Sequence, residues 1–360
     1  MDEYMKYFVV KKHLTLGALA LSFPLLLSAQ ASQALNIALT NDDGWDAAGI
    51  QTLKKALVGA GHTVTLAGSS ENQSGSSAAI NLGKYNLRIT KQADKDGETG
   101  ANEYSVALAD GTGAEPATAG QVAIAIAQQN GEPVDLLISG TNAGGNVGAM
   151  TNLSGTVGAV VHALSYANGV AVPAIAFSTD EVIPERYCPE GKEASCAYVN
   201  YKHFKKVASW MVGFVAQLET KPGWLGYEDQ LLPKGVALNI NYPTNIISGY
   251  DEAGDPEYSY LEEITGVTLN VQGKLPSLGG LPIALPVGCY SDCVNAEVGS
   301  VSYGGITGTP VIENVNEKHH ADTTAYAQGN VTIVPIDVNL TANPFQRLKF
   351  KKLVRDLNVQ

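Results

Sequence analysis

The chain has 360 residues, 45% of them hydrophobic and 16% charged, and a formal net charge of −12. That is enough apolar material for one large core or two lobes. The negative net charge argues against a nucleic-acid polymer as the main partner, because proteins that bind one usually carry a basic face. A small phosphorylated ligand is still compatible with this charge if a divalent cation reverses the local field.

The N-terminal segment has the pattern of a secretory signal peptide. Lys6, Lys11 and Lys12 precede an apolar run over 14–27, and small residues follow at 29–31. This order predicts that residues 1–31 are removed and that the protein is periplasmic or secreted. The apolar run is short for a membrane span, and no later run approaches the roughly 20 residues that a span needs.

The first strand of the mature chain ends in two adjacent carboxylates. The apolar run from Leu35 to Leu39 is followed by Thr40, Asn41, Asp42, Asp43 and Gly44. Such a run is typical of a buried parallel strand, whose carboxyl end is where open α/β sheets place their ligand sites. A plain turn is the alternative, because Asn, Asp and Gly are common in turns.

Helical and strand patterns alternate after this strand. Periodicity predicts helices over 47–61, 121–129, 154–167, 201–218 and 344–357, strands over 62–67, 134–138, 172–177, 236–242 and 331–338, and a β-hairpin within 81–108. We therefore expect an α/β fold: a Rossmann-like parallel sheet with helices on both faces, plus a β-rich or extended C-terminal region.

The expected domains follow from these patterns. Residues 32–246 form the α/β core, with a Cys-bearing surface insertion at 179–199. Residues 247–330, rich in Gly and Pro, form an arm or a small second lobe, and 331–360 supply a closing strand and a terminal helix. We found no internal repeat.

The four cysteines favour two local disulfides. In an oxidising compartment, Cys188 would pair with Cys196 and Cys289 with Cys293, each closing a small surface loop. A zinc site is the alternative, but neither spacing matches the usual pairs of zinc ligands.

Three polar loops follow three of the predicted strands, so they open on one edge of the sheet. They lie at 41–44, 69–77 and 139–148. Two carboxylates, a hydroxyl and an amide oxygen form an all-oxygen ligand set that suits Mg²⁺, Mn²⁺ or Ca²⁺. Taken singly, the Ser-rich loop at 69–77 is more typical of a solvated turn.

A Ser-Gly-Thr sequence opens the helix predicted over 154–167. Ser154 could be a simple N-cap. The same geometry presents main-chain N–H groups and the positive end of the helix dipole to an anion, so beside a cation site phosphate binding is the favoured interpretation.

Six motifs in order resemble the SurE (survival protein E) family and cover most of residues 35–342 in pieces. They are Thr40-Asn41-Asp42-Asp43-Gly44, Gln73-Ser74-Gly75, the run from Ser139 to Gly148, Ser154-Gly155-Thr156-Val157, Asn239-Ile240-Asn241-Tyr242-Pro243, and Asp322 with the run from Gly329 to Ile336. Any one of these would be a weak signal, whereas the ordered set is specific.

The resemblance implies a divalent-metal-dependent phosphomonoesterase that hydrolyses nucleoside 5′- and 3′-monophosphates with a metal-activated water. The implied metal ligands are Asp42, Asp43, Ser74 and Asn142, with Asp43 closest to the attacking water. The positions implied around the phosphate or substrate are Asn41, Gly75, Asn146, Ser154, Gly155 and Thr156. Asn41 also counts among the implied catalytic residues with the two aspartates, and His320 is a candidate leaving-group acid, although a surface histidine without a role is the commoner case.

Departures from the family pattern keep two alternatives open. Ser70-Glu71-Asn72-Gln73 stands where the family has Asp-Arg-x-Arg, so two positive charges are missing. Such a loss weakens a selective grip on the substrate. A phosphatase acting on non-nucleotide phosphomonoesters, or a non-catalytic metal- or nucleotide-binding exported protein, is the alternative. The family also suggests a homodimer or tetramer with an exchanged C-terminal region.

Overall fold

The computed structural model describes residues 34–81, 86–93, 102–164, 171–183, 187–220, 231–250, 256–273, 276–277 and 320–337. The predicted signal peptide, the Cys289 and Cys293 pair and the helix over 344–357 lie outside these residues. Within the described part, no helix is long and apolar enough to cross a membrane.

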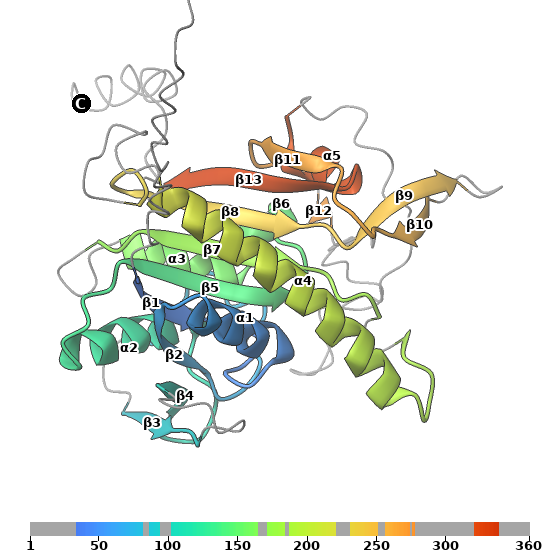
Figure 1. Cartoon of the computed structure of the whole chain (residues 1–360). Helices are drawn as coiled ribbons and strands as arrows, with labels where there is room; N and C mark the ends of the chain where they lie inside the picture. The colour runs from blue at the N-terminus through green and yellow to red at the C-terminus, as the bar shows by residue number, and fades with distance from the viewer. Residues whose placement is uncertain are drawn as a thin grey trace, which may run out of the picture. The chain divides into compact units, whose positions relative to one another are not determined.

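A nine-stranded sheet is the framework of the fold, in the order β11-β13-β8-β7-β5-β1-β2-β4-β3 (Figure 1). Its strands are β1 (Asn36–Thr40), β2 (Thr63–Ser69), β3 (Leu87–Lys91), β4 (Glu103–Leu108), β5 (Leu136–Ala143), β7 (Ala174–Thr179), β8 (Val236–Tyr242), β11 (Gly266–Leu269) and β13 (Asn330–Asp337). The sheet is mixed, because β13 runs antiparallel to β8 and β3 antiparallel to β4, while the other pairs are parallel.

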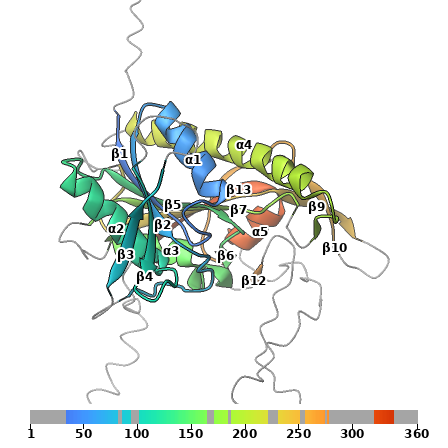
Figure 2. The same ribbon diagram turned by 90° about the horizontal axis from the view of Figure 1, so that it is seen from below.

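Helices cover both faces of this sheet, as Figure 2 shows. On one face α1 (Ala48–Gly59) packs beside α4 (Glu193–Glu219), and on the other α2 (Pro116–Gln129) packs beside α3 (Gly155–Leu164). Each face has its own apolar core, one centred on Ile50, Leu53 and Phe177 and the other on Val122 and Val160. The expected α/β fold with helices on both faces is confirmed.

The smaller elements lie in the later half of the chain or in loops. They are β6 (Val147–Gly148), the 3₁₀ helix η1 (Ala149–Asn152), β9 (Asn245–Tyr250), β10 (Pro256–Tyr260), β12 (Pro276–Ser277) and α5 (Asp322–Ala327). β9 pairs with β10 and β6 with β12, both antiparallel. The weak periodicity of residues 247–330 suggested an arm, but β11, which lies in this region, joins the edge of the main sheet. The domain boundary at 247 remains a prediction.

Three predicted boundaries differ from the structure. Helix α2 begins five residues earlier than expected, at Pro116, because proline is well suited to the first turn of a helix. Helix α4 begins at Glu193, so part of the predicted insertion 179–199 is helical and carries Cys196. Strand β5 continues past Ile138 to Ala143, with an irregularity in its pairing between Ser139 and Asn142.

The strand order changes direction at β1. From β1 the chain moves to β2 and β4 on one side, whereas β5 and β7 lie on the other. Crevices at such a switch point are where open α/β sheets bind ligands, outside the carboxyl ends of the strands. Asp42 and Asp43 directly follow β1, and Asn142 lies near the end of β5.

Candidate cation and phosphate site

Asp42 is buried against the start of helix α3. Asp42 is only 3% exposed, and the Thr156 hydroxyl donates to Asp42 Oδ1 at 2.5 Å. Burial raises the pKa of Asp42, although hydrogen bonds from Thr156 and from the main-chain N–H groups of Thr156 and Gly155 oppose that rise. A Cβ added to Gly155 would lie 3.0 Å from the Cβ of Asp42, so glycine permits this close packing.

Asp43 lies beside Asp42 and is half-buried. The main-chain N–H of Ala143 donates to its Oδ2 at 2.7 Å, and Asn72 Nδ2 lies 3.5 Å from its Oδ1. Burial raises the pKa of Asp43 to about 7, and the nearby charges of Asp42 and Glu181 add to the rise. Two neighbouring buried carboxylates with raised pKa values form a site that a cation would stabilise.

The other two predicted ligands are brought to the same place by main-chain contacts. Ser74 is exposed on the loop after β2, where the Gln73 N–H donates to the Asp42 carbonyl at 2.7 Å. Asn142 is 7% exposed, and its Nδ2 donates to the Gly144 carbonyl at 2.6 Å. That contact uses the amide nitrogen of Asn142, which leaves the amide oxygen as the atom suited to a cation.

The residues present fit a hard divalent cation. No lysine, arginine or histidine in the described part of the chain makes a salt bridge with Asp42 or Asp43. Nor do the described residues contain a group of three or more His, Cys, Asp or Glu side chains placed to hold a metal. A cation here would therefore need the neutral oxygens of Ser74 and Asn142, as the all-oxygen set predicted.

Buried polar atoms without partners gather at the same edge of the sheet. Asn41 is fully buried, and neither polar atom of its amide has a hydrogen-bond partner among the described residues. The hydroxyls of Thr40, Ser139 and Thr141, toward the ends of β1 and β5, are also buried without a hydrogen-bond partner among the described residues. Leaving such atoms unsatisfied is costly, which supports a ligand-binding role for Asn41 and this edge of the sheet.

The predicted phosphate-binding helix start proves to have two uses. Ser154 caps α3, because the Val157 N–H donates to its Oγ at 3.1 Å. The Thr156 hydroxyl donates to Asp42 in this structure, and the predicted position of Thr156 beside the phosphate stays a prediction. Gly75 is exposed with a φ of 85°, in the loop that carries Ser74.

Asn146 is held by the protein itself. Its main-chain N–H donates to Asn241 Oδ1 at 2.6 Å, and its Nδ2 donates to the Ser178 hydroxyl at 2.9 Å. Its carbonyl accepts from Asn239 Nδ2 at 2.8 Å. Asn146 thus has a structural role, in which the Asn239 and Asn241 side chains fix the loop, and its predicted substrate contact stays a prediction.

His320 lies on the wall of a cavity of about 1000 Å³ that also reaches the start of α3. Other residues that line this cavity are Ser77, Asn152, Ser154, Val157 and Gln272. The side chains of Asp42 and Asp43 do not line it; the link is Ser154, which neighbours the Gly155 that packs on Asp42. His320 and Ser154 thus line one cavity, and the role of His320 as the leaving-group acid stays a prediction.

Three residues that the sequence did not single out for the site support its loops. Asp322 is fully buried and accepts from the N–H groups of Gly148 at 3.1 Å and Gly273 at 2.7 Å. Asp180 and Tyr326 contact Gly145. The signal for Asp322 was its place in a family motif, whereas Asp180 and Tyr326 had no local signal.

The loop that carries Ser74 packs tightly on α3, which leads to a prediction at Gly158. A Cβ added there would lie 1.9 Å from the Ser77 carbonyl oxygen. We expect Gly158→Ala to lower the free energy of unfolding by about 1–3 kcal/mol, the usual cost of overpacking, as measured by urea unfolding.

Gly213→Ala is the matched control for this substitution. Gly213 is also within a helix, α4, but nothing lies within 4 Å of an added Cβ. That variant should gain about 0.5–1 kcal/mol, because alanine is the better helix former. Equal stability of Gly158→Ala and wild type would show that the loop adjusts without cost.

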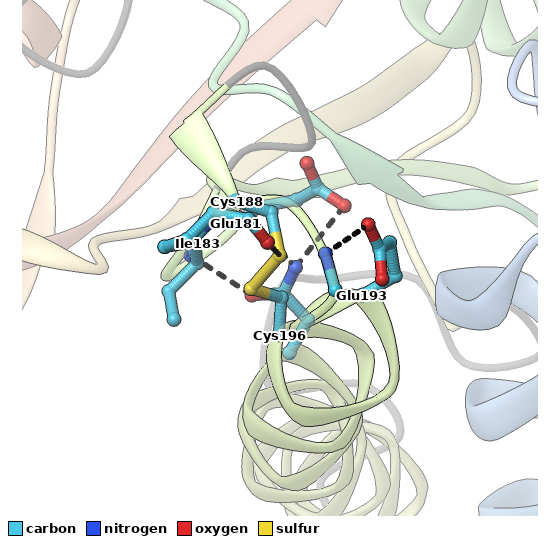
Figure 3. The surroundings of a disulfide bond; sticks show 8 residues. Glu181, Ile183, Cys188, Glu193 and Cys196 are labelled. Carbon is cyan, nitrogen blue, oxygen red and sulfur yellow. Dashed lines mark hydrogen bonds between the residues drawn. A yellow bond between two sulfur atoms is a disulfide. The ribbon is translucent and has the colours of Figure 1, made fainter.

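A disulfide joins Cys188 to Cys196, which is the first of the two predicted pairings (Figure 3). Asn200 anchors the same segment. Its Oδ1 accepts from the N–H of Ile183 at 3.0 Å, and its Nδ2 donates to the Ile183 carbonyl at 2.8 Å. The segment after β7, which contains Asp180 and Glu181, is thereby fastened to α4.

Comparison with known proteins identifies the family of the chain. The profile of the family described as Survival protein SurE matches residues 37–267. A protein named 5′-nucleotidase SurE from Lawsonia intracellularis is 30% identical over 212 residues, which span 58% of this chain and 66% of that relative. Another of that name, from Actinobacillus pleuropneumoniae, is 26% identical over 86% of this chain and 96% of its own length.

A solved structure shares the fold. The crystal structure of SurE protein from Aquifex aeolicus aligns with a TM-score of 0.55 and 21% sequence identity, covering 89% of this chain and 99% of that one. At this identity the match supports the architecture alone.

Proposed function

The chain belongs to the SurE family, and on that premise we propose that it is a divalent-metal-dependent phosphomonoesterase that hydrolyses nucleoside 5′- or 3′-monophosphates. The observation that carries this proposal is the pair Asp42 and Asp43 at the switch point of the sheet. Both have a raised pKa, and neither forms a salt bridge with a cationic side chain of the described residues. Asp42 also accepts a hydrogen bond from Thr156 at the start of α3.

The residues divide the work as follows. Asp42, Asp43, Ser74 and Asn142 would hold the cation, which supplies charge neutralisation for the phosphoryl oxygens and a more acidic water. Asp43 is the more exposed carboxylate, so we assign it the position beside the attacking water. Main-chain N–H groups at the start of α3 hold Asp42 in its orientation and add positive potential toward the phosphate.

We propose that the leaving group lies in the cavity beside Ser154. It combines apolar walls, such as Val157, with amide groups of Asn152 and Gln272, a mixture that suits a nucleoside. We assign His320, on the same wall, the role of donating a proton to the leaving oxygen.

The loop after β2 supports a second candidate function. Glu71 and Asn72 lie there, and Asn72 approaches Asp43, where arginines would have supplied positive charge. A phosphatase with broad specificity, acting on non-nucleotide phosphomonoesters, is therefore the alternative.

We further propose that the protein is exported and oligomeric. The pattern of residues 1–31 and the disulfide between Cys188 and Cys196 support an oxidising compartment outside the cytosol. A homodimer or tetramer is what the family resemblance suggests.

A panel of substrates tests the proposal. The chain from Ser32 onward is freed of metal and assayed for phosphate release from 5′-AMP, 3′-AMP and p-nitrophenyl phosphate with Mg²⁺, Mn²⁺, Ca²⁺ or chelator. We expect release only with a divalent cation, and faster release from a nucleotide than from p-nitrophenyl phosphate. The reverse preference would favour the broad phosphatase, and cation binding without hydrolysis would favour a non-catalytic protein.

A further inference from the structure

A hydrogen-bonded pair, Asp180 and Tyr326, joins two distant parts of the chain beside Gly145. The Tyr326 hydroxyl donates to Asp180 Oδ2 at 2.8 Å, although 146 positions separate the two residues. Asp180 directly follows β7, and Tyr326 belongs to α5 and is only 3% exposed. Tyr326 is therefore fixed in a dry setting, where such a bond to a carboxylate is strong.

Both members of the pair hold the same glycine. The N–H of Gly145 donates to Asp180 Oδ1 at 2.8 Å, so the two oxygens of this carboxylate are divided between the loop and the tyrosine. A Cβ added to Gly145 would lie 3.1 Å from the Tyr326 hydroxyl and 3.2 Å from its Cζ. The loop thus rests directly on the tyrosine ring.

Gly145 adjoins the main-chain segment that orients the proposed cation ligands. The next carbonyl along this segment, that of Gly144, accepts from Asn142 Nδ2 at 2.6 Å. The N–H of Ala143 donates to Asp43 Oδ2 at 2.7 Å. A shift of the chain at Gly145 would therefore move the partners of both Asn142 and Asp43.

We propose that Asp180 and Tyr326 are positioning residues for the cation site, acting through Gly145 on Asn142 and Asp43. This inference rests on the proposed function, because it takes Asn142 and Asp43 as the ligands. Partners that orient metal ligands from outside the ligand set commonly change metal affinity by about 10–100-fold when they are removed.

Two variants and a control test this proposal. Tyr326→Phe and Asp180→Asn remove one member each with little change of volume. Tyr242→Phe is the control, because this buried tyrosine contacts the network only through its main-chain carbonyl, which accepts from Tyr326 at 3.3 Å. Each protein is examined by thermal unfolding, by Mn²⁺ titration in the absence of substrate, and by amide hydrogen exchange of peptides covering residues 142–148.

Tyr326→Phe and Asp180→Asn should both fold. In each, the amide hydrogen of Gly145 should exchange faster, and the affinity for Mn²⁺ should be about 10-fold lower. Asp180→Asn should show the larger effect, because it removes the charge that strengthens both hydrogen bonds and leaves one acceptor oxygen where Gly145 and Tyr326 used two. High Mn²⁺ should restore activity, because the variants change occupancy rather than the reacting groups. Tyr242→Phe should match the wild type in exchange and in affinity, whereas a purely structural role predicts lower stability with unchanged Mn²⁺ affinity.

The outcomes separate this inference from the proposed function. Wild-type exchange at 142–148, or wild-type Mn²⁺ affinity, in both folded variants overturns the positioning role. If the wild type binds Mn²⁺ but releases phosphate from no monophosphate, the proposed activity is wrong. The positioning role of Asp180 and Tyr326 is then tested by Mn²⁺ binding and hydrogen exchange alone. A wild type that binds no Mn²⁺ overturns the inference together with the cation site.

Discussion

Asp43→Asn should lower cation-dependent phosphate release by about 1,000-fold or more while the protein remains folded. The substitution keeps the size of the side chain and one acceptor oxygen for the Ala143 N–H. It removes the charge that, with Asp42, would hold the cation and stabilise charge in the transition state, an effect typically worth 10²–10³-fold or more. The measurement is kcat for the best nucleotide of the panel at a concentration of Mn²⁺ or Mg²⁺ that saturates the wild type.

Asp46→Asn is the matched control. Asp46 lies three positions further along the same loop but is exposed, and it is not among the predicted ligands. Its replacement changes the net charge of the chain by the same amount, so a general electrostatic effect would appear in both variants. Near-wild-type turnover by Asp43→Asn would remove Asp43 from the mechanism.

The second large effect concerns stability and pH in the metal-free protein. Burial and the charge of Asp42 raise the pKa of Asp43 from 3.8 to about 7. Between these values the folded state keeps a proton that the unfolded state has released, so the free energy of unfolding falls as pH rises. The slope is about 1.4 kcal/mol per pH unit, or about 4 kcal/mol over three units.

The difference between Asp43→Asn and the wild type isolates this contribution. His203 acts in the opposite sense, because burial lowers its pKa to about 4 and stability is lost as pH falls below its ordinary value of 6.5. Both proteins keep His203, so its contribution cancels. Without metal, the stability of Asp43→Asn relative to the wild type should rise from pH 4 to pH 7 and then level off.

Urea unfolding at several pH values measures this difference. At pH 8, saturating Mg²⁺ should raise the unfolding midpoint of the wild type and leave that of Asp43→Asn nearly unchanged, because ligand binding to the folded state alone stabilises it. A difference curve that is flat with pH would mean that Asp43 has an ordinary pKa and that the two carboxylates are well solvated.

Local patterns in the sequence were sufficient for the main frame of the fold. The apolar run before Asp42 predicted β1, and helical spacing predicted α1 and α3, because the period of apolar residues depends only on neighbouring positions. The three polar loops at one sheet edge followed from the rule that parallel strands share an edge for their carboxyl ends. The pairing of Cys188 with Cys196 likewise needed only their short spacing.

The predicted limits of two strands were wrong because the local sequence pattern did not show where the strands pair. The glycine-rich stretch after Ile138 suggested a loop, yet pairing with β7 extends β5 to Ala143. Similarly, β11 has a weak pattern because Val267 and Leu269 are exposed, and its partner β13 lies more than sixty positions away in the chain. Neither pairing has a signature within the segment itself.

The sequence by itself determined which loops could bind a cation and an anion, because strand ends, polar loops and helix starts are local features, whereas the individual ligands Ser74 and Asn142 were implied by the family resemblance. Only the tertiary structure decided how they are used: Thr156 holds Asp42, Asn146 is bound by Asn239 and Asn241, and Asp180 with Tyr326 supports Gly145. The reason is physical. Burial and the partners that raise or lower a pKa depend on contacts between residues far apart in the chain, which no pattern of neighbours records.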